Sequence, residues 1–380
     1  MDQMRSDYVY RYWDNLGNNG FKRLFNEGFS FTNAHFNYML TSTGFGHTSI
    51  NAGTTPSVYG IMVKKWFVPL NQYRSLVERP NEFLLISGIE ITDRHADHLL
   101  AFHIDKVIPT VGGNENEKER MINDTVELVN DYKIRSSRNT YPVLAHPNWN
   151  WAITAEMIAN AEKLRFFEVY NGVPESNNTG DKLHPGTDRI WDIALSLRLQ
   201  NSDSKLLYGI AADDAHDYDG GIDGRNVGPG KGWIMVRSDT LSEKSILNAL
   251  DNGDFYSSTG VAINDFEFDG KRLTVEIKPE KGIEYRTMFI GTRLGFDDSN
   301  RARLDEAGIE IQNTTKVYSE EVGEVLKQSN NISSSYTLRG DELYVRVLIV
   351  SSADHLDPMT GEELGVQKAW LQPVTGKHFN

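Results

Sequence analysis

Between residues 62 and 263, short apolar stretches alternate with segments of helical spacing, and this alternation constrains the fold more than any other feature. The apolar stretches that predict strands are 83–89, 99–107, 141–145, 166–170, 205–212 and 232–236. Helices are predicted at 121–132, 154–163, 190–199 and 243–250. Strands that alternate with helices are typical of parallel sheets with crossover helices. We therefore predict an α/β fold with parallel strands for this region.

The pattern changes on either side of this region. Apolar and polar residues alternate with period two, between turns rich in glycine, aspartate and asparagine, at 272–277, 285–290, 336–338 and 343–350. We therefore predict an α/β domain over 62–265 and a small antiparallel β domain over 266–380. Residues 1–61 form a third region, with a predicted helix at 16–28, and we expect residues 1–12 to be loosely ordered.

Composition excludes several classes of site and partner. The 380 residues carry a net charge of −14, which argues against nucleic acid as a partner because phosphate backbones attract cationic surfaces. No apolar run reaches the ~18 residues that suggest a membrane span. The first ten residues do not have the pattern of a signal peptide, so cytoplasm and periplasm both stay open. Without cysteine, any metal must be held by His, Asp, Glu and water.

Side chains able to bind a metal follow several of the predicted strands. A single aspartate after a strand is more often a turn former than a ligand, but recurrence on consecutive strands predicts a shared site. In parallel α/β barrels, ligands and catalytic groups lie at the carboxyl ends of the strands. Carboxylates and neutral imidazoles suit zinc, iron or manganese. The residues at or next to these strand ends are Glu90, His146, Glu168, Asn171, Asp214 and His216.

Four segments together carry a family resemblance: 88–92 (GIEIT), 145–149 (AHPNW), 166–172 (FFEVYNG) and 212–216 (ADDAH). They resemble PHP (polymerase and histidinol phosphatase) domains, and the region after 265 is similar to the tail of some PHP hydrolases. The resemblance implies a distorted (β/α)7 barrel. It also implies a cluster of divalent ions, zinc, manganese or iron, where a metal-bound hydroxide attacks the ester of a small phosphorylated substrate.

The resemblance also assigns roles to residues of the first two matching strands. Glu90 would bridge metal ions, and His98 would be a further ligand. His95 and His103 compete with His98 for this role. The His-x-His pair and the second Asp/His motif with which PHP domains open have no counterpart in this sequence, so we predict that the barrel is incomplete.

The later strands supply the remaining residues of the implied site. His146, Asp214 and His216 would complete the metal cluster. Glu168 and Asn171 would support these ligands or line the substrate pocket. Outside the matching segments, Arg225 can meet the substrate phosphate, with a solvated surface arginine as the alternative.

Residues 1–61 resemble a different family, the type I phosphodiesterase and alkaline phosphatase superfamily. The matching segments are 2–8 (DQMRSDY), 35–38 (HFNY), 41–47 (TSTGFGH) and 52–56 (AGTTP). In that family the first aspartate binds zinc and the threonine is the nucleophile, which the resemblance transfers to Asp2 and Thr43. The alternative is that both are inert remnants, because the family's other ligands are not found and Lys64 replaces an expected asparagine.

These observations lead to one function hypothesis with two alternatives. We predict a metal-dependent phosphoester hydrolase of PHP type. The first alternative is a catalytically impaired metal-binding protein, and the second is alkaline-phosphatase-like chemistry at Thr43. We also hypothesise a chimera, in which pieces of two genes are joined near residues 61–65.

Overall fold

The computed structural model describes residues 11–18, 21–27, 61–62, 65–66, 74, 76–93, 98–200, 204–216 and 227–376. The chain divides into two compact units, Met1–Glu78 and Arg79–Asn380, which we call the N-terminal unit and the main unit. Asp2, Thr43, His95, Arg225 and most of the segment 1–12 lie outside the described residues, so the predictions about them are not examined by the structure.

The N-terminal unit contains short elements in its described parts. They are the 3₁₀ helix η1 Trp13–Asn15, the helix α2 Phe21–Glu27, and the antiparallel pair β1 Ile61–Met62 and β2 Lys65–Trp66. Helix α2 occupies the second half of the helix predicted at 16–28. Arg23 and Glu27 form an ion pair of 3.1 Å one turn apart on its surface, an arrangement that supports short helices.

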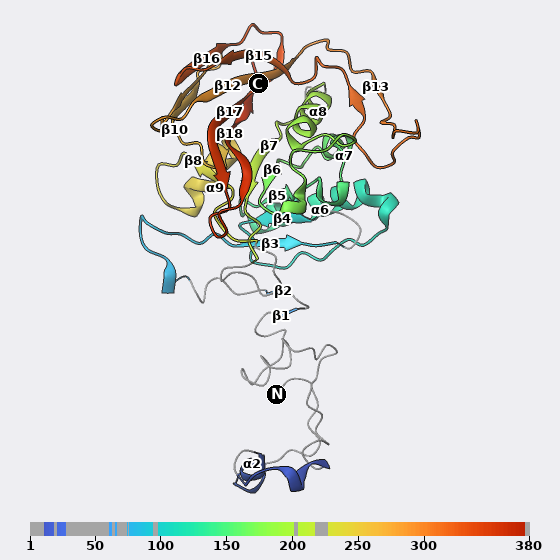
Figure 1. Ribbon diagram of the computed structural model, residues 1–380, viewed down its shortest axis with the longest axis vertical. Helices are drawn as coiled ribbons and strands as arrows, with labels where there is room; N and C mark the ends of the chain where they lie inside the picture. The colour runs from blue at the N-terminus through green and yellow to red at the C-terminus, as the bar shows by residue number, and fades with distance from the viewer. Residues whose placement is uncertain are drawn as a thin grey trace. The chain divides into compact units, whose positions relative to one another are not determined.

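The main unit contains a five-stranded sheet with the order β3-β4-β5-β6-β7 (Figure 1). Strands β5, β6 and β7 are parallel, as the sequence predicts, whereas β3 pairs antiparallel with β4 and β4 antiparallel with β5. In the part of the chain that the structure describes, this sheet is open and does not close into a barrel. The strands are β3 Gly88–Ile91, β4 Leu99–Phe102, β5 Tyr141–Leu144, β6 Phe166–Asn171 and β7 Tyr208–Ala212.

The prediction of parallel strands is therefore wrong at β3 and β4. Residues 92–98 connect these two strands, and a parallel pair needs a crossover of about a dozen residues or more. A hairpin forms instead and reverses the direction of β4. The strand bounds differ too: β3 includes Glu90, and β4 stops before His103, which has a left-handed φ of 56°.

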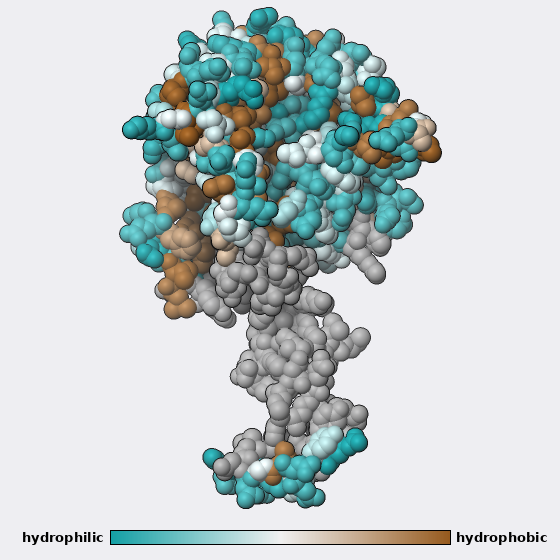
Figure 2. All heavy atoms as spheres, viewed as in Figure 1, coloured by the Kyte–Doolittle hydropathy of each residue, from teal (hydrophilic) through white to brown (hydrophobic). Residues whose placement is uncertain are grey.

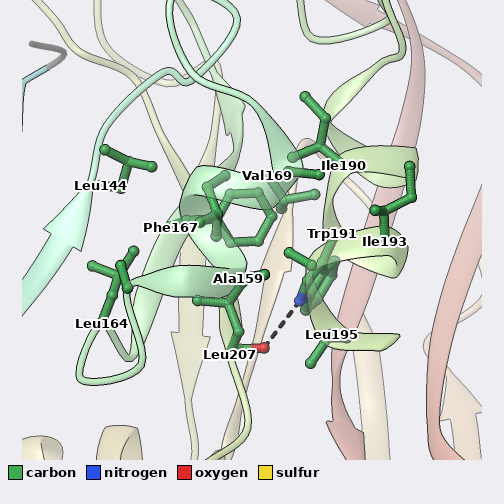
Figure 3. Close-up of a cluster of buried hydrophobic side chains, with 14 of the residues drawn as sticks. Leu144, Ala159, Leu164, Phe167, Val169, Ile190, Trp191, Ile193, Leu195 and Leu207 are labelled. Carbon is green, nitrogen blue, oxygen red and sulfur yellow. Dashed lines mark hydrogen bonds between the residues drawn. The ribbon is translucent and has the colours of Figure 1, made fainter. Parts of the chain in front are cut away.

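Four helices pack around this sheet: α6 Lys118–Ser136, α7 Ala155–Asn160, α8 Thr187–Leu199 and α9 Glu243–Asn252. The Thr154 hydroxyl caps the N-terminus of α7, since it accepts the Met157 N–H at 3.3 Å. Figure 3 shows the core between β6 and α8, where the rings of Phe167 and Trp191 lie 5.6 Å apart. The Trp191 indole donates to the Leu207 carbonyl at 2.9 Å, which satisfies its buried N–H.

A second, antiparallel sheet has the order β15-β12-β17-β18-β9-β8. Its strands β8 and β9 precede residue 265, so the sheet crosses the predicted domain boundary. The prediction of parallel strands is also wrong at β8, which pairs antiparallel with β9 in this second sheet. Figure 1 shows β17 and β18 beside α8, and residues of β6, α8 and β17 share one hydrophobic cluster. The strands are β8 Trp233–Val236, β9 Phe255–Ser258, β12 Tyr285–Arg293, β15 Glu324–Ser329, β17 Glu342–Leu356 and β18 Glu363–Val374.

Smaller sheets complete the main unit. One is three-stranded, with the order β10-β11-β16, and buries a separate apolar cluster against the second sheet. Its strands are β10 Ile263–Phe268, β11 Arg272–Ile277 and β16 Ser333–Thr337, and a further pair joins β13 Asn300–Arg301 to β14 Val317–Tyr318. At this level the fold is mixed α/β, as predicted.

A buried ion pair ties α8 to β17. The Arg346 guanidinium donates to both carboxylate oxygens of Asp192 at 2.7 Å, and its side chain is 1% exposed. The Tyr344 hydroxyl donates to the same carboxylate at 2.8 Å. This contact fixes the second sheet against the helix that follows β6.

The face of the main unit seen in Figure 2 is mostly hydrophilic. None of the helices in the described ranges has the length and apolar character needed to cross a bilayer.

Candidate metal centre

Glu90, His98 and His146 form one compact group, although they come from three different segments. Each offers a ligand atom, and these atoms all lie within 4.8 Å of one another. Nδ1 of His98 contacts a carboxylate oxygen of Glu90, and the rings of His98 and His146 lie 4.9 Å apart, edge to face. Two imidazoles and a carboxylate at this spacing can hold a divalent cation.

The backbone explains why these three side chains meet. The β3–β4 hairpin places Glu90 beside the start of β4, and His98 directly precedes that strand. The Ala145 N–H donates to the His98 carbonyl at 2.9 Å, which binds the hairpin to the end of β5. His146 then leaves β5 with a positive φ of 22°, an uncommon backbone conformation for a residue other than glycine.

Asp214 extends the group from the end of β7. Its Oδ2 lies 3.9 Å from Nε2 of His146, and its backbone also has a positive φ, of 51°. Since β5 and β7 both run parallel to β6, the segments that follow them reach the same edge of the sheet. This is the convergence that the sequence predicts for strand-end residues.

His216 lies at the margin of the centre. Its side chain is 62% exposed, and its Nδ1 is 2.6 Å from the backbone oxygen of Asp214 and 3.8 Å from the Oδ1 of that residue. The structure therefore brings His216 next to Asp214, but not into the compact group of Glu90, His98 and His146.

Glu168 contacts the backbone of His146 but does not belong to the compact group of Glu90, His98 and His146. The side chain is 2% exposed and accepts the His146 backbone N–H at 2.8 Å and the Asn171 amide at 2.7 Å. Burial raises the pKa of Glu168 to about 7, although both hydrogen bonds oppose the rise. The carboxyl thus anchors the loop that carries His146.

Asn171 links this anchor to Asp214. Its amide nitrogen donates to Glu168 and also, at 3.3 Å, to Oδ2 of Asp214. Its amide oxygen accepts the Ser176 hydroxyl at 2.8 Å and the Val173 N–H at 2.9 Å, which fixes the orientation of the group. Glu168 and Asn171 therefore hydrogen-bond to His146 and Asp214, and their expected role in supporting metal ligands stays a prediction.

Aromatic residues next to the centre were missed by the sequence analysis. The Trp149 ring lies 5.5 Å from the rings of both His98 and His146. In the same loop, the Trp151 ring stacks on His184 at 4.1 Å, and His184 contacts Asp181 at 2.9 Å. The motif at 145–149 contains the tryptophan, but sequence spacing does not reveal which ring it faces.

His95 and His103 compete with His98 for the role of ligand, and of these two the structure describes only His103, which lies away from the centre. Nε2 of His103 is 3.5 Å from a carboxylate oxygen of Glu243, on α9. The compact group thus offers one carboxylate and two imidazoles, from Glu90, His98 and His146, and the Asp214 carboxylate lies 3.9 Å from His146. Side chains of these types can bind zinc, manganese or iron(II), and they do not select among these ions.

The matches to known proteins lie in the N-terminal part of the chain. Residues 1–86 match the family Type I phosphodiesterase / nucleotide pyrophosphatase. The resemblance predicted for residues 1–61 is thereby confirmed, and the match continues to residue 86. Glu90, His98, His146 and Asp214 all lie after the matched residues.

Individual relatives match over the same short region. Alkaline phosphatase PafA of Elizabethkingia meningoseptica is 49% identical over 67 residues, which are 18% of this chain and 12% of that protein. Alkaline phosphatase PhoV of Synechococcus elongatus is 51% identical over 69 residues, again 18% and 12%. A calcium-transporting ATPase of Myroides odoratus is 52% identical over 61 residues, 16% and 11%. The chain thus spans about 12% of the length of these relatives.

Proposed function

We propose that the main unit is a metal-dependent phosphoester hydrolase of PHP type that acts on a small phosphorylated substrate. The observation that carries this proposal is the convergence of Glu90, His98 and His146 within 4.8 Å, with Asp214 3.9 Å from His146. Four residues from separate segments meet at one edge of the sheet, and all four have side chains that bind divalent cations. The matched N-terminal region, from a phosphoesterase family, is consistent with phosphoester chemistry but does not include these residues.

The four ligands would hold zinc, manganese or iron, and the bound cation would polarise the phosphate and activate water. In the reaction, a water oxygen bonds to phosphorus while the bond to the ester oxygen breaks, and the alcohol leaves with a proton. Asn171 keeps the Asp214 carboxylate in place through its 3.3 Å hydrogen bond. Glu168 holds the His146 backbone in position, and Trp149 shields the two imidazoles from one side.

Two further residues belong to the proposal as peripheral members. His216, beside Asp214, would be an additional ligand on the exposed side of the centre. Arg225 would contact the substrate phosphate. The PHP assignment also implies ligands from an opening motif that this sequence does not contain, so the number of bound ions and the activity fall below those of a complete cluster. A protein that binds metal without turnover is the corresponding alternative.

A second candidate function rests on the match of residues 1–86. In it, Thr43 is the nucleophile and Asp2 a zinc ligand, as in type I phosphodiesterases and alkaline phosphatases. The two candidates place their chemistry in different units of the chain, and the hypothesis that the chain joins two ancestries belongs to this proposal.

One assay separates these candidates. Hydrolysis of p-nitrophenyl phosphate is measured with and without added Mn²⁺ for the wild type, Asp214→Ala and Thr43→Ala. The proposed function predicts Mn²⁺-dependent turnover that is lost in Asp214→Ala and retained in Thr43→Ala. Turnover lost only in Thr43→Ala contradicts the proposal and supports the second candidate, and no turnover in any variant supports the metal-binding alternative.

A further inference from the structure

A cavity of about 760 Å³ lies beside the candidate metal centre. Its walls come from the end of β6 and the loop after it, the first turn of α8 and the strands β17 and β18. This volume falls in the range of small-molecule sites in proteins. The residues on which the argument rests are Tyr170, Asn171, Asp188, His355, Lys368 and Trp370, all of which line the cavity.

Some polar groups that line the cavity already bond to other residues of the protein. The Asp188 carboxylate accepts the Trp370 indole N–H at 3.0 Å and lies 3.3 Å from Arg346. The Arg189 guanidinium donates to the backbone carbonyls of Tyr318, Ser319 and Val322. These contacts hold the helix and the strands together, and they engage Oδ1 of Asp188 and the Arg189 guanidinium.

Three other groups of the wall are available. Within the described residues, neither the Tyr170 hydroxyl nor the Lys368 ammonium has a hydrogen-bonding partner, and the ammonium lies 5.9 Å from the centroid of the Trp370 ring. His355 is 4% exposed, and its Nε2 has no hydrogen-bonding partner there either. An unsatisfied polar atom at such depth is costly, so a ligand that bonds it gains more than it would at the surface.

The available groups surround two aromatic rings. The Tyr170 ring lies 5.6 Å from the His355 ring and 6.2 Å from the Trp370 ring. The planes of the Tyr170 and Trp370 rings make an angle of 28°. Burial lowers the pKa of His355, so the ring is neutral at neutral pH, and its hydrogen bond to the Lys231 backbone leaves Nε2 as an acceptor. The cavity thus offers a donor in Lys368, an acceptor in His355 and both in Tyr170.

We infer that this cavity binds the hydroxyl-bearing ring of a sugar phosphate, so that the strands β17 and β18 set the substrate specificity of the hydrolase. A sugar combines hydroxyl groups, which donate and accept hydrogen bonds, with apolar C–H faces that pack on aromatic rings such as Tyr170 and Trp370. Asn171 connects the two sites, because it lines the cavity and its amide also bonds Asp214. The inference rests on the proposed function.

Binding is tested first, independently of turnover. Saturation-transfer NMR measures the affinity of ribose 5-phosphate for the wild type, Tyr170→Phe, Lys368→Met and the control Lys271→Met, with and without Mn²⁺. Tyr170→Phe and Lys368→Met each remove one polar group that has no protein partner, so the fold is preserved, whereas Lys271 is exposed and does not line the cavity. Loss of one hydrogen bond predicts a dissociation constant raised about threefold to tenfold, and more for the charged lysine.

The outcomes separate this inference from the proposed function. Weaker binding in Tyr170→Phe and Lys368→Met, but not in Lys271→Met, supports the cavity even if no hydrolysis occurs. Equal binding in all four proteins, or none in the wild type, overturns it. Where hydrolysis is present, the ratio of kcat/KM for ribose 5-phosphate to that for p-nitrophenyl phosphate falls in the two cavity variants through a higher KM. An unchanged ratio contradicts the inference and leaves the hydrolase proposal standing.

Discussion

The buried carboxyl of Glu168 accepts the backbone N–H of His146 at 2.8 Å. This bond joins β6 to the loop after β5 at the point where the chain turns with a positive φ. It therefore determines where the His146 imidazole lies relative to Glu90, His98 and Asp214. The geometry of the candidate centre depends on a residue outside the group of possible ligands, an arrangement that is common for metal sites in proteins.

Replacing Glu168 by alanine is expected to destabilise the metal-free protein. The variant leaves the His146 N–H and the Asn171 amide without their buried acceptor, which costs about 1–3 kcal/mol for each unsatisfied group. Glu168→Gln keeps an acceptor oxygen and is the matched control, with a smaller loss. Urea denaturation measures both, and an alanine variant as stable as the wild type would show that the anchor is unimportant.

Asn171→Ala is expected to weaken metal binding without removing a ligand. The amide orients Asp214 and Glu168, and outer partners of this kind contribute about tenfold to a hundredfold to metal affinity. Isothermal titration with Mn²⁺ measures the effect, and Asn264→Ala, at an exposed position of β10, provides the control. Equal affinity in the two variants would refute this role for Asn171.

Arg346→Met is expected to lower the free energy of unfolding by about 3–5 kcal/mol, because it leaves the Asp192 carboxylate buried without its partner. The double variant with Asp192→Asn has no unpaired charge and should recover part of this loss. Chemical denaturation of the two variants and the wild type gives the comparison. A double variant less stable than Arg346→Met alone would contradict the explanation.

We expect the buried carboxyl of Glu342 to make a contribution to the stability of the fold that depends on pH. Burial alone would raise the pKa of this carboxyl, but hydrogen bonds from the Tyr336 hydroxyl and the N–H groups of Arg339 and Gly340 outweigh burial and hold the pKa below the usual range of a glutamate. A carboxyl with a lowered folded pKa stabilises the fold above its unfolded value and loses this effect as pH falls through the folded value. Glu342→Gln should therefore cost about 1–3 kcal/mol at neutral pH.

Thermal unfolding of Glu342→Gln and the wild type across pH provides the measurement. The difference in stability should shrink as the pH falls below about 4.5, since protonation then removes the same charge from the wild type. A difference that stays constant from neutral to acidic pH would show that the charge of Glu342 is not the cause.

Part of the site could be predicted from sequence because parallel strands impose a common edge. His146 and Asp214 follow strands that are parallel in the structure, and their segments meet where the pattern indicated, whereas Glu168 lies within the parallel strand β6 rather than at its end. Glu90 and His98 reach the same place by the β3–β4 hairpin. The short connection at 92–98 indicates this hairpin, whereas the overall alternation of strands and helices favours parallel strands.

Other features depend on contacts between distant residues. Strands β8 and β9 join the second sheet through pairing of β9 with β18, across more than a hundred residues of sequence. Such pairing follows from packing rather than from local preference. The cavity likewise depends on the position of Tyr170 beside His355 and Trp370. The local sequence around Tyr170 does not indicate that these two residues are its neighbours.

Metal content tests the central claim most directly. The purified wild type is saturated with Mn²⁺ or Zn²⁺, dialysed and analysed by inductively coupled plasma mass spectrometry, beside His146→Ala, Asp214→Ala and His103→Ala. We predict at least one ion per chain in the wild type and in His103→Ala, whose imidazole faces Glu243, and a clear loss in the other two variants. A wild type without bound metal, or equal metal in all four proteins, would contradict the proposed centre.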